Sequence, residues 1–309
     1  MTEPRIVVVG STMIDLVAYA DRLPGDGETV VGSSYVTGFG GKGANQAVVA
    51  ARFGARVAMV NTLGDDNHGD AYLERFASEG IDTSFVRRTP GSSGVAPIWV
   101  DARGTNRIII VPGANLEVRP DVAAEAVTAL MPQIVIGQFE IPQATTAAAF
   151  GAARGVGATT ILNPAPGAAV DPGLLAMTDW LVPNETEFAL LTGRSLAGSS
   201  NEEGKVLAST ADRLRCSLVV TLGERGAIVA RPGEAAVAVD TPRVTAIDTT
   251  GAGDAFVGAF AVGLALGLPP VDAARLGCAA AADSVTRLGT QTSYPDRQGA
   301  AAILAAYRD

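Results

Sequence analysis

An aspartate follows a glycine-rich turn where the chain enters a long apolar stretch. Residues 248–256 read DTTGAGDAF, and the sequence continues as VGAFAVGLALG. The consecutive backbone amides of Gly251, Ala252 and Gly253 can converge on an anion, and the start of the following helix adds its dipole. Such a turn suits the charge on a transferring phosphoryl group, and Asp254 beside it could take a proton from an attacking hydroxyl. An ordinary aspartate in the first turn of a helix is the alternative.

A second glycine-rich segment, GFGGKGAN at 38–45, precedes a predicted helix. It satisfies the GxGxxG pattern of dinucleotide sites, but it follows an irregular segment, whereas that motif belongs at the first strand–helix turn. We expect instead a backbone that closely approaches a polyhydroxylated ligand, with Lys42 and Asn45 as polar groups in the loop. Tight packing at the helix start is the alternative. The chain contains no GxxxxGK[ST] motif, so the sequence argues against a P-loop.

Two further acidic sites follow predicted strands. Asp15 lies four residues beyond Ser11, past the carboxyl end of the first strand. Open α/β sheets bind ligands at that edge, although a turn or cap aspartate is equally compatible. In NETE at 184–187, Asn184 and Glu187 have the spacing of a helix capping box. The alternative is an acid and an amide near Mg²⁺ or its waters, since Mg²⁺ prefers oxygen ligands.

Composition excludes several classes of function. The net charge of −9 argues against nucleic-acid binding and against a basic membrane-binding face. Two cysteines and one histidine, with no CxxC pair, make a zinc site, a disulfide framework and a Ser-His-Asp hydrolase poor explanations. We therefore expect a reduced, cytoplasmic setting.

The elements that must position these residues alternate between strands and helices. This βαβ pattern favours a parallel sheet with helices on both faces. The segments 12–38 and 94–111 break the alternation and predict a small separate sheet, while 217–230 predicts a strand hairpin. The other predicted strands fall within 5–11, 56–66, 133–140, 158–166 and 179–183, and the helices within 40–54, 68–80, 143–157, 185–193, 252–267 and 271–289.

Five motifs occur in one order along the chain: GGKGAN, NPAP at 163–166, PNETE at 183–187, TLGERGA at 221–227 and DTTGAGDAF. In this set and order the chain resembles the ribokinase-like (PfkB-type) sugar kinases along essentially its full length. The resemblance implies a Rossmann-like, three-layer α/β/α body formed by 1–11, 39–93 and 112–309. It also implies a small β-sheet lid formed by 12–38 and 94–111, which often serves as the clasp of a homodimer.

The resemblance further implies ATP-dependent phosphorylation of the terminal 5-hydroxyl of a pentose, with D-ribose first. Mg²⁺ would be required and K⁺ would activate. A 2-deoxyribose kinase, or another sugar or nucleoside kinase of this family, is the alternative. A nicotinamide-dependent oxidoreductase that uses the GxGxxG match, and a sugar sensor without catalysis, are further alternatives; the retained Asp254 disfavours the sensor.

The family's site residues carry over onto matching positions of this sequence. Asp254 would be the base, with Gly251, Ala252 and Gly253 as the anion hole. The sugar pocket would comprise Met13, Asp15, Gly41, Lys42, Asn45, Glu140 and Asp254. The nucleotide would contact Asn184, Thr221, Gly223, Gly226, Gly253 and Cys278. Glu187 would support Mg²⁺ through water, and the K⁺ loop would use Asp248, Thr250, Ser284, Arg287, Gly289 and Ser293, mostly through backbone carbonyls.

Met13 departs from part of the family pattern, because some ribokinase-like pentose kinases carry an asparagine two residues before the first-strand aspartate. Methionine cannot hydrogen-bond a sugar hydroxyl strongly. The loss of one polar contact would weaken discrimination against a deoxysugar. The exact pentose is therefore left open by the sequence.

Overall fold

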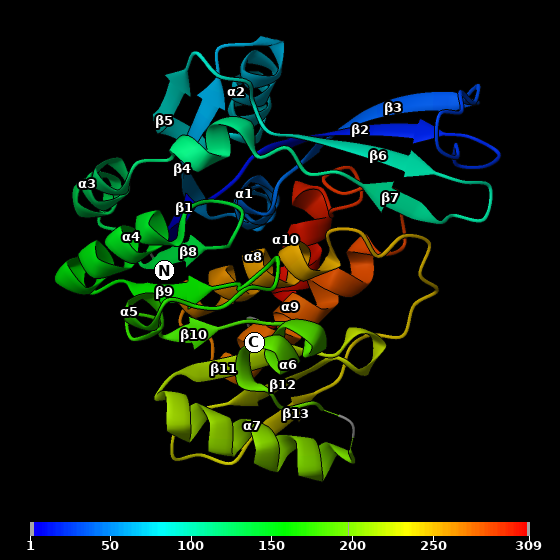
Figure 1. Cartoon of the computed structure of the whole chain (residues 1–309). Coiled ribbons are helices and arrows are strands. Elements are labelled where there is room, and N and C mark those ends of the chain that lie inside the picture. The colour runs from blue at the N-terminus through cyan, green and yellow to red at the C-terminus, as the bar shows by residue number, and fades with distance from the viewer. Residues whose placement is uncertain (1–2, 197, 308–309) are drawn as a thin grey trace.

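The computed structural model describes residues 3–196 and 198–307, and the predicted ends of the body at residues 1 and 309 lie outside this part. Its main feature is a nine-stranded sheet in the order β13-β12-β11-β10-β9-β8-β1-β4-β5 (Figure 1). Pairing is parallel from β11 to β5, and β12 and β13 add an antiparallel edge, so the predicted hairpin is confirmed. The strands are β1 (Arg5–Val9), β4 (Arg56–Gly64), β5 (Asp82–Thr89), β8 (Ile134–Gly137), β9 (Thr159–Leu162), β10 (Trp180–Leu181), β11 (Ser217–Thr221), β12 (Ala227–Ala230) and β13 (Val237–Val239).

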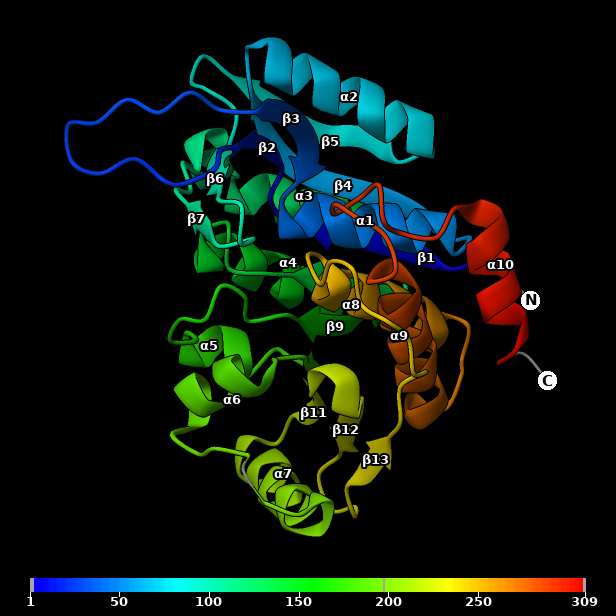
Figure 2. The same cartoon turned by 90° about the vertical axis from the view of Figure 1, so that its right-hand side faces the viewer.

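Helices cover both faces of this sheet, which gives the predicted three layers (Figure 2). One face packs on α1 (Lys42–Arg52), α2 (Asn67–Glu79), α8 (Ala252–Ala265), α9 (Pro270–Ser284) and α10 (Arg297–Ala305). The other face packs on α3 (Pro120–Leu130), α4 (Gln143–Val156), α5 (Pro172–Leu175), α6 (Glu185–Thr192) and α7 (Ser200–Leu214). Two short 3-10 turns, η1 (Gly113–Glu117) and η2 (Gly223–Arg225), lie in loops.

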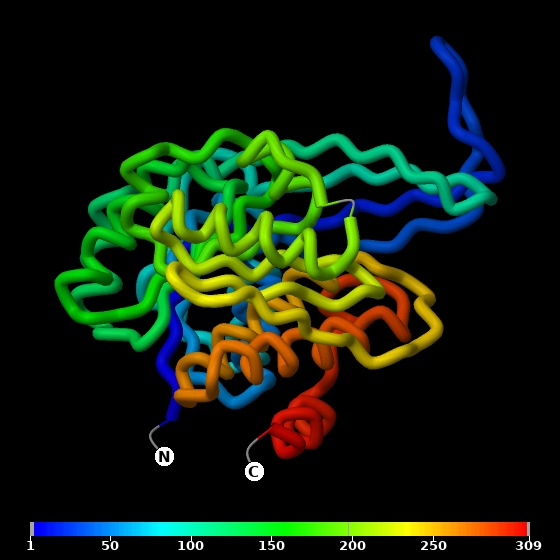
Figure 3. Tube along the Cα trace, turned by 90° about the horizontal axis from the view of Figure 1, so that it is seen from below, coloured from blue at the N-terminus to red at the C-terminus, as the bar shows by residue number. Residues whose placement is uncertain are grey.

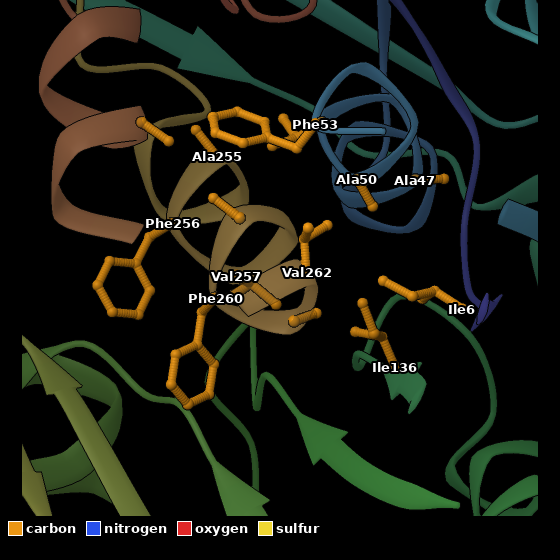
Figure 4. Close-up of a cluster of buried hydrophobic side chains, with 14 of the residues drawn as sticks. Ile6, Ala47, Ala50, Phe53, Ile136, Ala255, Phe256, Val257, Phe260 and Val262 are labelled. Carbon is orange, nitrogen blue, oxygen red and sulfur yellow. The ribbon is translucent and has the colours of Figure 1, made fainter. Parts of the chain in front are cut away.

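The interior strand β1 contributes apolar side chains to both faces of the sheet. In β1, Ile6 and Val8 belong to the core on the α1 and α8 side, whereas Val7 and Val9 belong to the opposite core. Successive side chains of a strand point to opposite faces, so an unbroken apolar run marks a strand covered on both sides. Figure 4 shows Ile6 beneath Ala47 and Ala50 of α1 and next to Ile136 of β8. The start of α8, where Asp254 lies, is anchored in the same core by the buried Ala255, Phe256 and Val257.

A second sheet of four strands extends away from the body (Figure 3). It has the order β3-β2-β6-β7, with β2 (Met13–Tyr19), β3 (Ser34–Gly40), β6 (Val95–Val100) and β7 (Asn106–Ile108). Its strands come from the two segments that interrupt the alternation, so the predicted small sheet is confirmed. The division into separate domains and the role as a dimer clasp stay predictions.

Buried polar side chains fasten this sheet to the body. The Asn115 side chain accepts from Thr12 N at 3.0 Å and donates to Thr12 O at 2.7 Å, and Asn61 donates to Asn115 at 3.2 Å. The Tyr72 hydroxyl of α2 donates to the carbonyl oxygens of Met13 and Gly40, where β2 and β3 begin and end. Since buried backbone groups must find partners, these contacts fix the point where the chain leaves the body.

The carboxyl-terminal part differs from the prediction. The predicted final helix over 271–289 ends at Ser284 as α9, and residues 285–296 form turns that are held by tertiary contacts, such as Gly289 N to Asp248 Oδ2 at 2.9 Å. A further helix, α10, follows, and α7 was not predicted either. Within the described residues no helix is long and apolar enough to cross a membrane.

Candidate active site

Asp254 lies in the first turn of α8 and is 5% exposed. Each of its carboxylate oxygens accepts one side-chain amide hydrogen bond. Asn45 Nδ2 donates to Oδ2 at 2.9 Å, and Gln46 Nε2 donates to Oδ1 at 2.9 Å. These two hydrogen bonds leave further lone pairs on both oxygens free to accept. Asp254 is therefore a fixed, buried acceptor.

The glycine turn before Asp254 presents backbone toward open space. Gly251 is the N-cap of α8 with φ 78°, and a Cβ there would come within 2.5 Å of the Tyr294 hydroxyl. A Cβ at Gly253 would meet nothing within 4 Å, so this glycine faces a space that a ligand could fill. The Ala252 amide donates to Thr249 O at 3.2 Å, whereas in the described residues the amides of Gly251 and Gly253 have no backbone acceptor. The turn can therefore receive an anion with fewer amides than the sequence predicts.

The GGKGAN loop is explained largely by packing. A Cβ at Gly41, which has φ 85°, would come within 2.7 Å of the Thr12 and Met13 backbone, and one at Gly43 within 2.5 Å of Ser11 N. The glycines thus let α1 start against the end of β1, which is the alternative that the sequence left open. The predicted contact of Gly41 with a sugar stays a prediction.

Glu140, which follows β8, closes the amino end of α1. Its Oε2 accepts from Lys42 N at 2.9 Å and from the Ser11 hydroxyl. A carboxylate at this place satisfies an unpaired helix amide and complements the helix dipole. The predicted sugar-pocket residue Glu140 is therefore also a helix cap.

Asp15 of β2 is only partly buried, and its carboxylate lies against Gly40, where a Cβ would come within 2.6 Å of Oδ2. Burial and the nearby charge of Glu140 raise the pKa of Asp15 from 3.8 to about 7. No hydrogen bond within the described residues offsets this rise. Asp15 is thus an acceptor without a protein donor. Met13, two residues earlier, is 3% exposed, and its Sδ faces Gly94.

Lys42 connects the acids of the site. Burial lowers its pKa, but the charges of Asp254, Glu140 and Glu187 outweigh burial and raise it. Burial raises the pKa of Glu187, against the Asn184 backbone hydrogen bond and the Lys42 charge. Asn184 and Glu187 form the predicted capping box, with reciprocal bonds of 2.8 and 2.9 Å. One ammonium therefore lies among three carboxylates.

The residues predicted for the nucleotide come from the start of α6, from the end of β11 and the turn after it, and from α8 and α9. Asn184 and Thr221 are joined by an isolated parallel bridge, and Gly223 and Gly226 have φ of 58° and 83°. Cys278 of α9 is 3% exposed, and its carbonyl accepts from the Thr241 hydroxyl at 3.4 Å. Burial raises the pKa of both Cys278 and Cys216 to about 12, and both thiols are free.

The two halves of the predicted cation loop meet at Asp248. Its Oδ1 accepts from Thr250 N at 2.9 Å and its Oδ2 from Gly289 N at 2.9 Å. Burial is the largest single influence on the pKa of Asp248 and raises it. The hydrogen bonds from Thr250 and Gly289 together outweigh burial, so the pKa lies below its usual value. Arg287 Nε donates to Ser293 O at 2.9 Å, and the Ser284 hydroxyl donates to Ala281 O. Hydrogen bonds thus join Asp248 to Thr250 and to Gly289, and Arg287 to Ser293, while the use of the six predicted positions as cation ligands stays a prediction.

Comparison with known proteins shows the family of this chain. The model of the pfkB family of carbohydrate kinases matches residues 3–297. The chain belongs to this family. It is therefore a carbohydrate kinase.

The relatives of this pfkB kinase span its full length. A deoxyribokinase from Salmonella typhi is 39% identical over 294 residues, covering 94% of this chain and 95% of the relative. A ribokinase from Mus musculus is 39% identical over 296 residues, covering 94% and 91%. The structure of Arabidopsis thaliana ribokinase complexed with ribose and ATP has a TM-score of 0.89 at 31% identity and covers 100% of both chains.

Sequence reasoning missed the buried amides around the base of this pfkB kinase. Gln138 Nε2 donates to Gln46 Oε1 at 2.7 Å, and Gln46 also donates to Asn163 at 3.1 Å. Gln291 Nε2 donates to Asn45 Oδ1 at 3.1 Å. Gln46 directly follows the GGKGAN motif and Asn163 is the first residue of NPAP, so their place beside these motifs could have marked them as site residues. Gln138 and Gln291 had none.

Proposed function

We propose that the protein transfers the terminal phosphoryl group of ATP to the 5-hydroxyl of D-ribose. The observation that carries this proposal is the buried Asp254 carboxylate, held by two amides beside a glycine turn that opens to solvent. The full-length likeness to ribokinases, including one complexed with ribose and ATP, supports the choice of substrates.

The proton step follows from the position of Asp254. Its two oxygens are each held by one amide, so the carboxylate cannot rotate freely. As the hydroxyl oxygen attacks phosphorus, its proton passes to a free lone pair of this carboxylate. The phosphorus–oxygen bond to the leaving diphosphate breaks, and the products are the sugar phosphate and ADP.

Charge on the transferred group would be met by the Gly251–Gly253 turn and by Lys42. The turn supplies backbone amides and the helix dipole, and the Lys42 ammonium, charged because of its three acidic neighbours, supplies a positive charge. Preorganised donors of this kind stabilise the transition state without having to reorient.

Mg²⁺ fits the site as an ion bound mainly by phosphates. Among the described residues no group of three or more acidic, histidine or cysteine side chains could enclose a metal. Mg²⁺ usually keeps several waters and binds through one or two carboxylates plus substrate phosphates. Glu187, whose carboxylate lies near Lys42 and Asp254, would contact such a water. The ion would neutralise charge on the phosphates.

K⁺ is proposed as an activator at the loop cluster around Asp248. The available ligands there are carbonyl, carboxylate and hydroxyl oxygens, which suit a hard cation. A cation at Asp248, Thr250, Ser284, Arg287, Gly289 and Ser293 would order the turn that leads into α8. The base would then be held in place through its own helix.

A 2-deoxyribose kinase is the second candidate. Met13 offers no hydrogen bond to a sugar hydroxyl at the pocket position where some family members have asparagine, and the deoxyribokinase from Salmonella typhi is 39% identical. A pocket that makes no contact with a given hydroxyl rejects the analogue lacking it only weakly.

A coupled assay of ADP release across ribose, 2-deoxyribose, fructose, fructose phosphate and adenosine tests both candidates. We expect the highest kcat/KM with ribose. A higher value with 2-deoxyribose would favour the second candidate, and turnover of a different compound without turnover of either pentose would reject both. Met13→Asn is the matched variant, and it should raise the preference for ribose over 2-deoxyribose about tenfold.

Dimerisation through the small sheet is a further part of the proposal. Tyr35 and Val36 of β3 are 62% and 53% exposed, and Ile108, Ile109 and Ile110 are about half exposed. Exposed apolar surface of this extent marks an interaction site. Sedimentation velocity should show a dimer for the wild type and a monomer for Val36→Asp; a monomeric wild type would contradict it. The free, buried cysteines are compatible with the expected cytoplasmic setting.

A further inference from the structure

A directional chain of hydrogen bonds reaches the base from α2. Arg75 Nε donates to Gln291 Oε1 at 3.0 Å, Gln291 Nε2 donates to Asn45 Oδ1 at 3.1 Å, and Asn45 Nδ2 donates to Asp254 at 2.9 Å. Gln291 and Asn45 are 2% and 4% exposed, so solvent cannot replace these partners. The four residues come from separate segments of the polypeptide. Each amide has one donating and one accepting end, so the direction of one hydrogen bond sets the direction of the next.

The two ends of this chain dictate the orientation of both amides. A guanidinium can only donate, so the Gln291 atom facing Arg75 must be its oxygen. The Gln291 nitrogen then faces Asn45, whose oxygen must face Gln291 and whose nitrogen must face Asp254. An ionised carboxylate can only accept, which closes the sequence without conflict. Any reversal would place two acceptors or two donors against each other.

Arg75 is itself fixed, so the chain has a rigid origin. Its Nη2 lies 2.9 Å from Glu79 Oε1, and its guanidinium lies over the Phe39 ring, 5.7 Å from the centroid. The Gln291 carbonyl also accepts from Arg52 at 3.2 Å, which holds the backbone of that loop residue.

We propose that Gln291 is a positioning residue for phosphoryl transfer, whose side-chain amide fixes the Asn45 amide with its nitrogen toward Asp254. Gln291 makes no hydrogen bond to Asp254, and its contact with the site is the one to Asn45, so it acts through Asn45. The proposal rests on the proposed function, in which Asp254 is the base and Asn45 lines the sugar site.

Gln291→Glu tests the polarity of this chain. The new carboxylate still accepts from Arg75 but cannot donate to Asn45, so the Asn45 amide lies between two carboxylates and is no longer held with its nitrogen toward Asp254. We expect kcat per folded enzyme to fall at least about tenfold, with the KM for ATP unchanged within about twofold. Gln291→Met removes the donor without adding a second carboxylate and should lower kcat less.

Gln133→Glu is the matched control. Like Gln291, Gln133 accepts a hydrogen bond with its side-chain oxygen, from Arg5 N, and donates one with its side-chain nitrogen, to Ala265 O, but it lies far from the site. Its kcat should stay within about twofold of the wild type. Circular dichroism and melting temperature give the folded fraction of each variant, so a loss of folded protein is separated from a loss of turnover.

The proposal is overturned if Gln291→Glu, or Gln291→Met, which also lacks the donor to Asn45, keeps wild-type kcat per folded enzyme. Asp254→Asn is assayed in parallel with ribose and ATP. If Asp254→Asn turns over normally, the proposed function fails; if it is inactive while Gln291→Glu is normal, only the role of Gln291 fails.

Discussion

Asp254 and Asp15, two of the acids of the proposed site, come from different regions of the molecule. Asp254 stands on α8 in the core, and both of its oxygens accept amide hydrogen bonds. Asp15 stands on β2 of the small sheet, accepts none from the described residues, and has its pKa raised to about 7. A group that must act on a proton at one place is fixed in advance, whereas a group that binds hydroxyls is left for the substrate to satisfy.

The largest effect should come from removing the fixed acid. Asp254→Asn keeps the size and most packing of the side chain but cannot accept a proton as a base. We expect kcat to fall about 10²–10⁴-fold, while ribose and ATP binding by calorimetry stays near the wild type. A small change in kcat would remove Asp254 from its role and abolish the distinction between the two acids.

Removing the unsatisfied acid should act mainly on sugar binding. Asp15→Ala takes away a charged acceptor, and hydrogen bonds to charged groups are worth about 1.5–3 kcal/mol. The KM for ribose should rise at least about tenfold, with a smaller change in kcat and an unchanged KM for ATP. If kcat fell as far as in Asp254→Asn, Asp15 would be part of the chemistry.

The raised pKa of Asp15 also predicts a cost in stability. With a folded pKa of about 7 and an unfolded value of 3.8, the folded state binds more protons between these values, so its stability falls as pH rises from about 4 to 7. Asp15→Asn should therefore raise the melting temperature at pH 8, and this gain should shrink as pH is lowered toward 4. A gain that does not vary with pH would point to packing and not to charge. Over the same pH range, wild-type kcat/KM for ribose should rise as Asp15 ionises.

The smallest effect should come from the cation. Asp248 lies in the segment that leads into α8, and Gly289 lies in the segment that carries Gln291. A cation that orders these two segments should therefore affect the position of Asp254 and not that of Asp15. Replacing K⁺ by Na⁺ should lower kcat several-fold and leave the KM for ribose within about twofold. Asp248→Ala should remove this difference between the ions. Equal activity in both ions for the wild type would leave the loop without this role.

The two sides of Asp254 also differ in how they end. The chain through Asn45 and Gln291 ends on a guanidinium, whereas the chain through Gln46 ends at Gln138, whose Oε1 is buried without a partner in the described residues. Gln46 donates to Asp254 and therefore turns its oxygen toward Gln138, so Gln138 must present its nitrogen to Gln46 and its oxygen to the opposite side. An unsatisfied buried acceptor costs about 1–3 kcal/mol. The site is therefore maintained against some loss of stability.

The sequence predicted those parts of the molecule that depend on neighbours in the chain. The apolar runs of β1 and β4, the capping box at Asn184 and the glycine turn before Asp254 each have a local pattern. The reason for Gly41 and Gly43 was ambiguous, because the backbone they pack against lies about 30 residues earlier.

The rest could not be predicted because its partners are distant. Gln291 and Asn45 are 246 positions apart, and Asn115 and Thr12 are 103 apart, so no spacing or periodicity marks them. The end of α9 at Ser284 was missed because tertiary contacts of the 285–296 loop, and not its composition, stop the helix.

The two buried cysteines make the molecule convenient for spectroscopic labelling. With their pKa values near 12, Cys216 and Cys278 remain uncharged thiols at neutral pH and react slowly with maleimides. A cysteine placed at the exposed Thr37 of β3 would then take up a dye selectively without removal of the native thiols. Paired with a second dye on α7, it would report the distance between small sheet and body as sugar and nucleotide are added.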